Sequence, residues 1–309
     1  MLTSPVVRCI KQQIPNAEVH YLTKKVFLPV VQAIGHTDKI YSIEKDINEV
    51  IEDLKKEGYN FIVDLHHNLR SMKVKSALKA KSAAFPKLNI EKWLLVNLKI
   101  NKLPGIHIVD RYFETVKSLG VKNDGLGLEY HIPANEEIDI AGLPSSHRNG
   151  YIGFVIGANH YTKQLPAHKI ISICKQLDMP IVLLGGKSDE AKAIEIEKTV
   201  GTKIYNACGK YSINGSTSLV RQATKIITHD TGLMHIAAAF KKEIISVWGN
   251  TVPEFGMYPY MPGADSHIME VHGLSCRPCS KIGYKACPKK HFKCMEQIDE
   301  AAIVKYIQA

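Results

Sequence analysis

The sequence predicts an α/β protein with parallel sheets and two domains, and three observations carry this prediction. The chain has 309 residues, which is longer than one hydrophobic core usually supports. Short apolar runs typical of buried strands alternate with stretches of helical periodicity. Residues 129–150 are rich in Pro, Gly, Ser and Asn and lack periodicity, which is typical of an interdomain region.

The first half holds one clear strand, the run NFIVDLHHN at residues 60–68, which ends in polar residues. An amphipathic helix is expected over residues 46–58, before this strand. Its apolar face consists of Ile47, Val50, Ile51 and Leu54. Residues 70–102 are strongly basic, with apolar side chains interleaved among the lysines.

The second half repeats a strand–helix unit three times. The runs YIGFVIGA, PIVLLGG and KIITHD each lead into a helix, near residues 166–178, 188–200 and 232–240. EIISVWGN predicts a further strand, and residues 297–309 predict a short amphipathic helix. We therefore expect a first domain at 1–145, a second at 146–296 with a Cys-rich loop at 272–294, and a C-terminal helix at 297–309.

Composition limits the class of protein. Hydrophobic residues make up 45% of the chain and charged residues 23%, as in ordinary soluble proteins. Apolar runs stay shorter than a membrane span of about 18 residues, and the polar start MLTSPVVRCIKQQIP does not resemble a secretory signal. We expect a cytoplasmic protein. The net charge of +10 favours an anionic partner: nucleic acid, membrane lipid or a phosphorylated metabolite.

Polar residues follow the three strands of the second half. In open α/β sheets, ligands bind beyond the carboxyl ends of strands, where helix N-termini attract phosphate. Each of these residues also fits an ordinary role as helix cap, turn residue or surface lysine. Their joint occurrence favours a phosphate-bearing nucleotide, whereas the missing G-x-G-x-x-G and P-loop patterns disfavour a dehydrogenase or a nucleoside triphosphatase. The candidates are Thr162, Lys163, Asp189, Glu190, Asp230, Thr231 and Gly232.

The chain resembles glycosyltransferase family 9, the ADP-heptose:lipopolysaccharide heptosyltransferases. The likeness is carried, in order, by LTSPVVRCIKQQIPNAEVHYLTKK, YNFIVDLHHNLRS, IGANHYTKQLP, LLGGKSDEAKA, THDTGLMHIAAAF, VWGNTVPEFGMYPY and the terminal cysteines. The resemblance implies a GT-B fold, in which two Rossmann-like domains face a cleft. It also implies inverting sugar transfer that needs no essential divalent metal, so protein cations and helix N-termini stabilise the leaving diphosphate.

The resemblance assigns the phosphate contacts of the sugar donor to the second half. Lys163 matches the lysine that contacts the diphosphate. Thr231, Gly232 and Leu233 match the loop whose backbone amides hold the phosphates. Asp230 is expected to orient that turn or to touch the sugar.

Other donor-side residues follow from the same resemblance. Glu190 falls where a carboxylate contacts the ribose, and its neighbour Asp189 competes for that role. Thr162 is assigned to the donor site because it precedes Lys163. His235 lies on the helix that begins with the phosphate-binding residues and is expected to support them without touching the ligand.

On the acceptor side, the resemblance places Asp64, His66, Asn68 and Arg70 at the border of the cleft. Either histidine of the HH pair also fits a structural role at the strand end. The basic segment 70–102 is expected to face a phosphorylated, membrane-embedded acceptor, and its alternative role is a solvated helix face.

The sequence departs from the family at its beginning. Family members start with a strand and a Gly-Asp loop upstream of the segment that matches LTSPVVR, and that loop supplies the catalytic base. Met1 falls inside the first helix, so we expect an N-terminal domain that lacks its first strand and a base that lies upstream of Met1. The loss of a central strand leaves a neighbouring strand edge unpaired. Two explanations account for the missing strand and loop: the start codon was placed too late, or the chain is an inactive homologue. Asp64 can replace the base only if the geometry brings it there.

Four of the seven cysteines lie close together in the segment CRPCSKIGYKACPKKHFKC. The spacing suits a structural zinc site, in which His291 or His272 could replace one thiolate. Reduced thiols and disulfides stay open as alternatives, and direct displacement requires no nucleophilic cysteine. The four are Cys276, Cys279, Cys287 and Cys294.

The resemblance implies an enzyme that moves a heptose or a related sugar from a nucleotide-diphosphate sugar to a lipopolysaccharide-core or lipid A-linked acceptor, and ADP-heptose is the expected donor. No cofactor is expected for catalysis, and peripheral contact with the inner membrane surface is compatible with the charge. The first alternative is a homologue that binds nucleotide sugar without turnover. The second, a nucleic-acid-binding protein, is disfavoured because the basic segment lacks regularly placed aromatic side chains.

Overall fold

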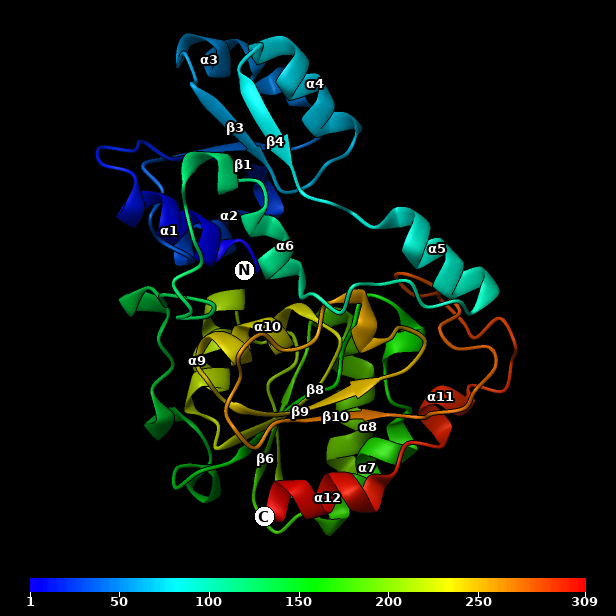
Figure 1. Ribbon diagram of the computed structural model, residues 1–309. Coiled ribbons are helices and arrows are strands. Elements are labelled where there is room, and N and C mark those ends of the chain that lie inside the picture. The colour runs from blue at the N-terminus through cyan, green and yellow to red at the C-terminus, as the bar shows by residue number, and fades with distance from the viewer. The chain divides into compact units, whose positions relative to one another are not determined.

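The computed structural model describes all 309 residues, which form two compact units (Figure 1). Unit 1 comprises Met1–Asn89 and Ile106–His131, and unit 2 comprises Ile90–Gly105 and Ile132–Ala309. All paired strands run parallel, so the predicted α/β architecture with parallel sheets is confirmed.

The division between the units differs from the expected domain boundary at residue 145. Residues 132–145 belong to unit 2 because their carboxylates are bonded to one of its helices. Glu136 accepts hydrogen bonds from the Ser212 hydroxyl at 2.5 Å and from the Asn214 amide at 2.7 Å. Glu137 accepts one from the Ser218 hydroxyl at 2.8 Å.

A second difference concerns residues 90–105, which fold with unit 2 although they lie within the first half of the chain. Leu95 is buried against Val252 and Phe255. Lys99 donates a hydrogen bond of 2.6 Å to the carbonyl oxygen of Pro278. Apolar burial and the hydrogen bond from Lys99 therefore fix this segment to the second unit.

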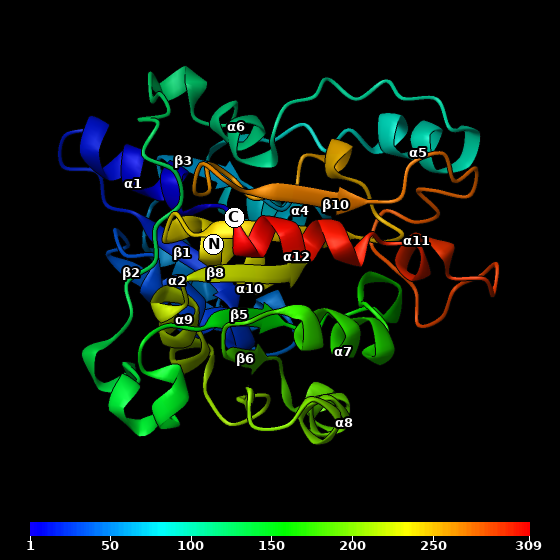
Figure 2. The ribbon, with the colours of Figure 1, turned by 90° about the horizontal axis from the view of Figure 1, so that it is seen from below.

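Unit 2 contains a six-stranded parallel sheet with the strand order β10-β9-β8-β5-β6-β7 (Figures 1 and 2). All residues of β5 and β6 are buried, as expected for strands covered on both faces, and this explains their continuous apolar runs. The strands are β5 Ile152–Val155, β6 Ile181–Leu184, β7 Ile204–Asn206, β8 Lys225–His229, β9 Glu243–Trp248 and β10 His267–Glu270.

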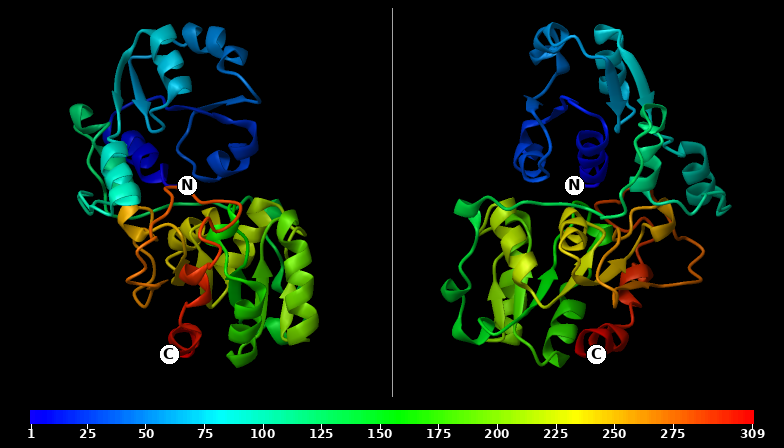
Figure 3. Two further views of the ribbon diagram at one scale, coloured as in Figure 1. Left: turned by 90° about the vertical axis from the view of Figure 1, so that its right-hand side faces the viewer. Right: turned by 60° about the vertical axis from the view of Figure 1, so that its left-hand side comes forward.

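Helices cover both faces of this sheet. Helices α7, α8 and α12 lie on one face, and α9 and α10 lie on the other (Figures 2 and 3). The C-terminal helix α12 is part of unit 2, because Ile303, Val304 and Ile307 are buried in the same core as the strands. The helices of unit 2 are α5 Asn89–Leu98, whose first residue belongs to unit 1, α7 Ala167–Gln176, α8 Glu190–Val200, α9 Ile213–Gln222, α10 Gly232–Ala239, α11 Lys293–Glu296 and α12 Glu300–Gln308.

Unit 1 has two separate pairs of parallel strands, β1–β2 and β3–β4, instead of one continuous sheet. Each strand therefore has one neighbour and one edge without a strand partner. The first helix begins at Ser4, so Met1 lies just before it and not inside it as the sequence had suggested. The elements are α1 Ser4–Gln13, β1 His20–Lys24, α2 Leu28–Ala33, β2 Lys39–Ile43, α3 Ile51–Lys56, β3 Phe61–Asp64, α4 Leu69–Leu78, β4 Lys81–Ala84 and α6 Ile108–Phe113.

The helix predicted over residues 46–58 is broken near its start. A 3₁₀ turn at Ile47–Glu49 comes first, and α3 begins only at Ile51. The Glu49 side chain accepts hydrogen bonds from the backbone amides of Glu44, Lys45 and Asp46. These bonds close a tight turn, and the α-helix starts beyond it. None of the helices has the length and apolarity that crossing a bilayer requires.

A buried arginine connects the two ends of unit 1. Arg8, on α1, is 5% exposed. It donates hydrogen bonds of 2.7 and 2.9 Å to the two carboxylate oxygens of Asp124 and one of 2.9 Å to Glu129. The bidentate contact with Arg8 lowers the pKa of Asp124 to about 2.

This pair predicts an acid-dependent loss of stability in unit 1. A carboxyl group with a lowered pKa stabilises the folded state above its unfolded pKa of about 4, and this stabilisation disappears as the pH falls towards about 2. For Asp124 it amounts to roughly 2 kcal/mol. We expect Asp124→Asn to lower the free energy of unfolding by about this amount at neutral pH and to flatten its decline in acid. Urea unfolding followed by circular dichroism across this pH range measures both effects.

The matched control is Asp53→Asn on α3, where the carboxylate is exposed and paired only with Lys56 at 2.7 Å. This control should keep the acid decline of the wild type. An equal pH profile for Asp124→Asn and the wild type would contradict the role of the Arg8–Asp124 pair.

Candidate functional site

The strand order of unit 2 places a reversal point at β5. The chain leaves β5 towards β6 and β7 on one side, and then returns to β8 on the other side of β5. The helices that follow β5 and β8 therefore lie on opposite faces of the sheet, which opens a crevice at the carboxyl ends of these two strands. Open α/β sheets bind ligands at such points.

Three side chains meet at this point and are called the Lys163 cluster here: Lys163, Asp230 and Thr251. Lys163 follows β5, and its ammonium group lies 2.5 Å from the Asp230 carboxylate, directly after β8. The Thr251 hydroxyl, three residues past β9, donates to the same oxygen of Asp230 at 3.0 Å. The Lys163 and Asp230 side chains are 14% and 10% exposed, so the ion pair is largely shielded from solvent.

The N-terminus of α10 lies next to the Lys163 cluster. Thr231 precedes the helix, but its side chain makes no capping hydrogen bond to the first turn. Gly232 is exposed, and a Cβ atom there would meet nothing within 4 Å. The start of α10 is therefore open to solvent at Gly232, with the positive end of the helix dipole behind it. This arrangement suits an anionic group such as phosphate.

A buried histidine fixes the loop that carries Lys163. His229, the last residue of β8, accepts a hydrogen bond of 2.9 Å at its Nε2 atom from the backbone amide of Leu165. Complete burial lowers the pKa of His229 to about 3, so the ring is neutral and its proton lies on Nδ1. The histidine therefore holds the loop after β5 against the end of β8.

The two carboxylates after β6 have different environments. Asp189 is 8% exposed and accepts a hydrogen bond of 2.9 Å from the Gly186 amide, which closes the turn. Its carboxylate also packs on Gly157, where a Cβ atom would lie 2.0 Å from Asp189 Oδ2. Glu190 is exposed at the start of α8. The structure therefore leaves Glu190 free for a ligand, whereas Asp189 supports the backbone.

Lys192 lies beside the turn that carries Lys163, and sequence analysis did not identify it. It lies in the first turn of α8 and donates a hydrogen bond to the Gln164 side chain, and its ammonium is 3.4 Å from the carbonyl oxygen of Ile156. Burial lowers the pKa of Lys192, although Asp189 opposes the shift. Thr251 was also missed, but the strand-end rule applied to EIISVWGN would have found it. For Lys192 no such pattern exists, because its position depends on how α8 packs against α7 and β7.

Two other predicted donor residues are buried. The Thr162 hydroxyl donates to the carbonyl oxygen of Tyr284 at 3.2 Å and accepts from the Tyr284 amide at 2.8 Å. Thr162 is 1% exposed, so it anchors the Cys-rich loop to the Lys163 turn and is not in contact with solvent. His235 is 6% exposed in the second turn of α10. Leu233, in the first turn, is partly exposed.

Asp64, the weak candidate for the base, is sequestered in unit 1. It ends β3, and its side chain is 1% exposed and lies 2.8 Å from the ammonium of Lys75. Its other oxygen accepts from the amides of His66 and His67 at 3.1 and 2.6 Å. Burial by itself would raise the pKa of Asp64, but Lys75 and these amides hold it below its ordinary range. This environment suits a structural carboxylate and does not suit a proton acceptor.

The acceptor-side residues after β3 divide between structural and exposed positions. Asn68 caps α4: its side chain accepts from the Ser71 amide at 3.0 Å, and the Ser71 hydroxyl accepts from the Asn68 amide at 2.9 Å. His66 and Arg70 are exposed. Partial burial, together with the positive charge of Lys87, lowers the pKa of His66. His66 and Arg70 therefore stay available for a ligand, whereas Asn68 is used by the helix.

The clustered cysteines surround a small cavity of about 20 Å³ in unit 2. All seven cysteines of the chain are free thiols, so the disulfide alternative is absent from this structure. The Asn250 side chain also lines the cavity, is 1% exposed, and has no hydrogen-bond partner for its amide nitrogen or oxygen. The Cys276 sulfur lies 3.8 Å from Nε2 of His291. The cavity-lining thiols are Cys276, Cys279, Cys287 and Cys294.

The Cys-rich loop is bonded to the strand ends that carry the Lys163 cluster. Arg277 donates to the carbonyl oxygens of Gly249 at 2.6 Å and Thr251 at 2.9 Å. The amide of Cys279 donates to the carbonyl oxygen of Asn250 at 3.3 Å. The loop therefore supports the backbone on which Thr251 is placed.

Comparison with known proteins supports one family. Residues 47–289 match the model of glycosyltransferase family 9 (heptosyltransferase). The chain is 30% identical over 112 residues to lipooligosaccharide heptosyltransferase 2 of Haemophilus influenzae, and the match covers 34% of this chain and 32% of that protein. A match of 29% identity over 133 residues to lipooligosaccharide heptosyltransferase 2 of Campylobacter jejuni covers 41% and 40%. The chain therefore spans only about a third to two-fifths of the length of these relatives.

Longer matches are more distant. Lipopolysaccharide heptosyltransferase 3 of Escherichia coli is 24% identical over 276 residues, 81% of this chain and 79% of that one. The structure of E. coli ADP-heptose lipopolysaccharide heptosyltransferase II has a TM-score of 0.74 at 17% identity and covers 99% of this chain and 93% of its own. A family 9 glycosyltransferase from Veillonella parvula has a TM-score of 0.78 at 20% identity, with 99% and 92% covered. The expected GT-B class of fold is confirmed.

The geometry of the Lys163 cluster predicts how diphosphate affinity responds to mutation. We expect Lys163→Ala to weaken the binding of a nucleoside diphosphate by about tenfold or more, because a charge-assisted hydrogen bond is lost and Asp230 is left without its cation. Isothermal titration calorimetry with ADP and with inorganic diphosphate measures the change.

The matched control is Lys175→Ala, an exposed lysine at the far end of α7. It should leave the affinity within the error of the wild type. Unchanged affinity in Lys163→Ala would remove this lysine from the site.

Proposed function

Since the chain belongs to glycosyltransferase family 9, we propose that it transfers a sugar from a nucleotide-diphosphate sugar to an acceptor hydroxyl. The observation that carries this proposal is the Lys163 cluster beside the uncapped N-terminus of α10. An ammonium group and an uncapped helix N-terminus there follow two neighbouring strands, and both kinds of group bind the oxygens of a diphosphate.

We propose ADP-heptose as the donor. Relatives matched over 112 and over 276 residues are both named heptosyltransferases, and one solved relative is described as an ADP-heptose enzyme. Glu190 supports a nucleoside contact, because its carboxylate is exposed at the start of α8, at the same edge of the sheet as Lys163. A carboxylate accepts hydrogen bonds from ribose hydroxyl groups, and this contact does not depend on which nucleobase the nucleotide carries.

The proposed reaction is a direct displacement with inversion. The acceptor oxygen attacks the anomeric carbon, the bond from that carbon to the diphosphate oxygen breaks, and the electron pair leaves with the nucleoside diphosphate. The developing negative charge is stabilised by Lys163 and by the amides of Thr231, Gly232 and Leu233. Asp230 neutralises part of the Lys163 charge and fixes the ammonium position. We therefore propose that transfer needs no divalent ion.

The hydroxyl proton has to pass to a base other than Asp64. A useful base must reach the acceptor and hold a proton near neutral pH. Asp64 is buried, paired with Lys75 and lowered in pKa, so it meets neither condition. The alternative function, binding of nucleotide sugar without turnover, is favoured by this one observation.

We propose that the acceptor is a lipopolysaccharide-core sugar at a membrane surface. Helix α5 presents Ile90, Trp93 and Leu98, which are 73%, 54% and 53% exposed, within the basic segment 70–102. Exposed apolar and aromatic side chains among lysines are typical of segments that lie on anionic lipid headgroups. Peripheral contact with the inner membrane face is therefore part of the proposal.

A transfer assay tests the enzyme proposal. The chain is incubated with ADP-heptose and a heptose-acceptor form of the lipopolysaccharide core in detergent, with and without a metal chelator, and the product is followed by the added mass of one heptosyl group. We expect transfer in both cases, with kcat/KM lowered about tenfold or more in Lys163→Ala and unchanged in Lys175→Ala. ADP-heptose binding without product would favour the non-transferring homologue, and an absence of both would refute the proposal.

A vesicle arm of the same assay separates the membrane contact from the chemistry. With the acceptor embedded in anionic vesicles, Ile90→Ser on α5 should lower the rate, while Ile194→Ser, an exposed isoleucine on α8, should not. In detergent both variants should match the wild type. Equal rates for the two variants on vesicles would argue against α5 as the membrane-facing helix.

We also propose that the Cys-rich loop holds a structural zinc ion. The chemistry of the donor set fits, because four thiols line one cavity and the buried amide of Asn250 there lacks a partner. The sulfur atoms lie too far apart in this structure for three of them to share one ion, so binding requires side-chain rotation. Three of the four cysteines are partly exposed, which leaves room for that rotation. The ion would stiffen the loop that supports Thr162 and Thr251.

Metal analysis of the purified chain tests this site. We expect about one zinc ion per chain by atomic emission, lost in the double variant Cys276→Ser/Cys279→Ser and retained in Cys174→Ala, a buried cysteine of α7. Because the loop supports the Lys163 cluster, the double variant should also bind ADP more weakly. Metal-free wild-type protein with four thiols that react with Ellman's reagent would establish reduced cysteines instead.

A further inference from the structure

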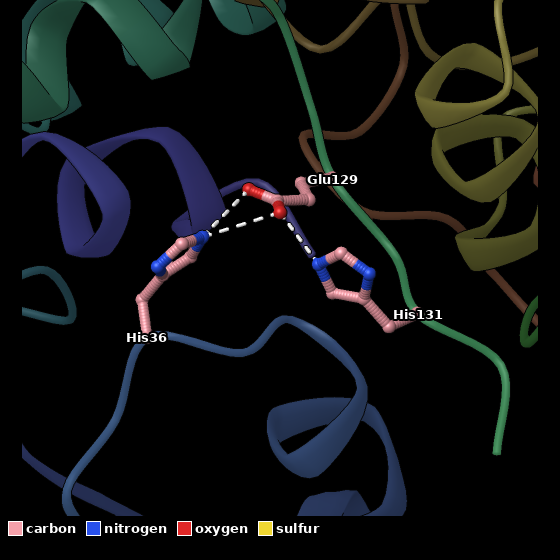
Figure 4. A group of neighbouring side chains, drawn as sticks. All are labelled: His36, Glu129 and His131. Carbon is pink, nitrogen blue, oxygen red and sulfur yellow. Dashed lines mark hydrogen bonds and ion pairs between the residues drawn. The ribbon is translucent and has the colours of Figure 1, made fainter.

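Three potential ligand side chains converge in unit 1: His36, Glu129 and His131 (Figure 4). None of them is a candidate residue for sugar transfer. His36 follows α2, whereas Glu129 and His131 come from the last segment of the unit. Nε2 of His36 lies 3.2 Å from both carboxylate oxygens of Glu129. Nε2 of His131 lies 2.5 Å from one of them. The three donor atoms fall within 4.8 Å of one another.

The backbone is shaped to bring these side chains together. Gly35 and His36 have φ values of 63° and 60°, so the chain turns through two left-handed residues after α2. The His131 amide then donates a hydrogen bond of 2.6 Å to the carbonyl oxygen of Ala33. A Cβ atom at Gly35 would lie 3.3 Å from Cδ2 of His131, tighter than ordinary contact. The turn and the approach of the histidine both favour glycine at this position.

The charges around the cluster favour a cation. Arg8 holds one oxygen of Glu129 at 2.9 Å, which orients the carboxylate towards the two histidines. The charge of Arg8 is already balanced by Asp124, with which it makes a bidentate contact. With neutral imidazoles, Arg8, Asp124 and Glu129 together carry one net negative charge. A divalent ion at the histidines would meet an attractive potential there.

The side chains are also accessible. The His36, Glu129 and His131 side chains are 30%, 20% and 62% exposed, so an ion can enter from solvent and keep water ligands. Two imidazole nitrogens and one carboxylate oxygen form a donor set that suits Zn²⁺ and neighbouring divalent transition metals.

A second group, Glu18, His20 and Glu57, has similar spacing but its donors are occupied. One ring nitrogen of His20 is bonded to the Tyr59 hydroxyl at 2.9 Å, and the other is 2.8 Å from Glu18. Glu57 is held by the ammonium of Lys39 and the hydroxyl of Tyr41. An ion there would have to displace a cation and a phenol hydrogen bond, so this group is the weaker site.

We propose that His36, Glu129 and His131 form a divalent transition-metal site of the Zn²⁺ type on the surface of unit 1. The bound ion replaces the direct contacts of the histidines with Glu129 by three metal–ligand bonds. It ties the turn at residues 34–38 to the segment 128–131, immediately before the chain enters unit 2 at Ile132. The site is separate from the Cys-rich loop, which lies in unit 2 and offers sulfur ligands. The proposal does not depend on the proposed sugar transfer.

Titration of the whole chain with Zn²⁺ tests the site. Bound equivalents are measured by calorimetry for the wild type, His36→Gln, His131→Gln and His168→Gln. His168 is the matched control, because it is an exposed histidine paired with one carboxylate, Glu296, at 3.0 Å. We expect both His36→Gln and His131→Gln to lose one bound Zn²⁺ ion, or to bind that ion with an affinity more than about tenfold lower. His168→Gln should keep it.

Hydrogen–deuterium exchange of the wild type gives a readout that needs no variant. Added Zn²⁺ should slow amide exchange at residues 34–38 and 128–132, because the ion joins these segments. The proposal would be overturned if all four proteins bound the same number of Zn²⁺ ions, or if Zn²⁺ left amide exchange at these segments unchanged. The three side chains would then form only a hydrogen-bonded His–Glu–His contact.

Discussion

The candidate site of unit 2 depends on one ion pair, between Lys163 and Asp230. The two residues are 67 positions apart in the chain, and they meet only because β5 and β8 are adjacent and parallel. Parallel alignment brings the carboxyl ends of neighbouring strands to one edge, so the loops that follow them share the same space. Each charge satisfies the other at low exposure, which makes the burial of both tolerable. The Thr251 hydroxyl extends the contact to a third strand end.

Around this pair, the irregular segments are held by specific polar contacts to the sheet. Neutral His229 fixes the loop after β5, and Asp189 closes the turn after β6. Arg277 and Thr162 attach the Cys-rich loop to the ends of β9 and β5. A long loop without regular structure otherwise loses backbone order easily. These bonds explain how a segment with little secondary structure takes part in a defined site.

The two units achieve order by different means. Unit 2 buries a continuous six-stranded sheet between two layers of helices, so apolar contact dominates. Unit 1 has two strand pairs that are not joined, and a buried arginine with two carboxylates binds its first helix to its last segment. The same segment carries Glu129 and His131. The polar network of unit 1 therefore both supports the fold and positions the histidine–carboxylate cluster.

The sequence by itself determined the α/β class, the parallel strands of the second half and the location of Lys163, Asp230 and Gly232 at strand ends. Apolar periodicity and turn residues are local signals, and they indicate where a strand stops and which polar side chains come next. The resemblance to family 9 was also contained in these segments. The tertiary structure alone decided which strand ends are neighbours, that Asp189 is used by a turn while Glu190 is free, and that Thr162 and Asp64 are buried.

The same reason explains what sequence reading missed. Lys192 meets the Gln164 side chain because α8 packs against α7 and β7, and His36 meets Glu129 across 93 residues. Whether a side chain contacts another element depends on strand order and on the angles between elements. No short window of sequence encodes these quantities, because they arise from the packing of the whole chain.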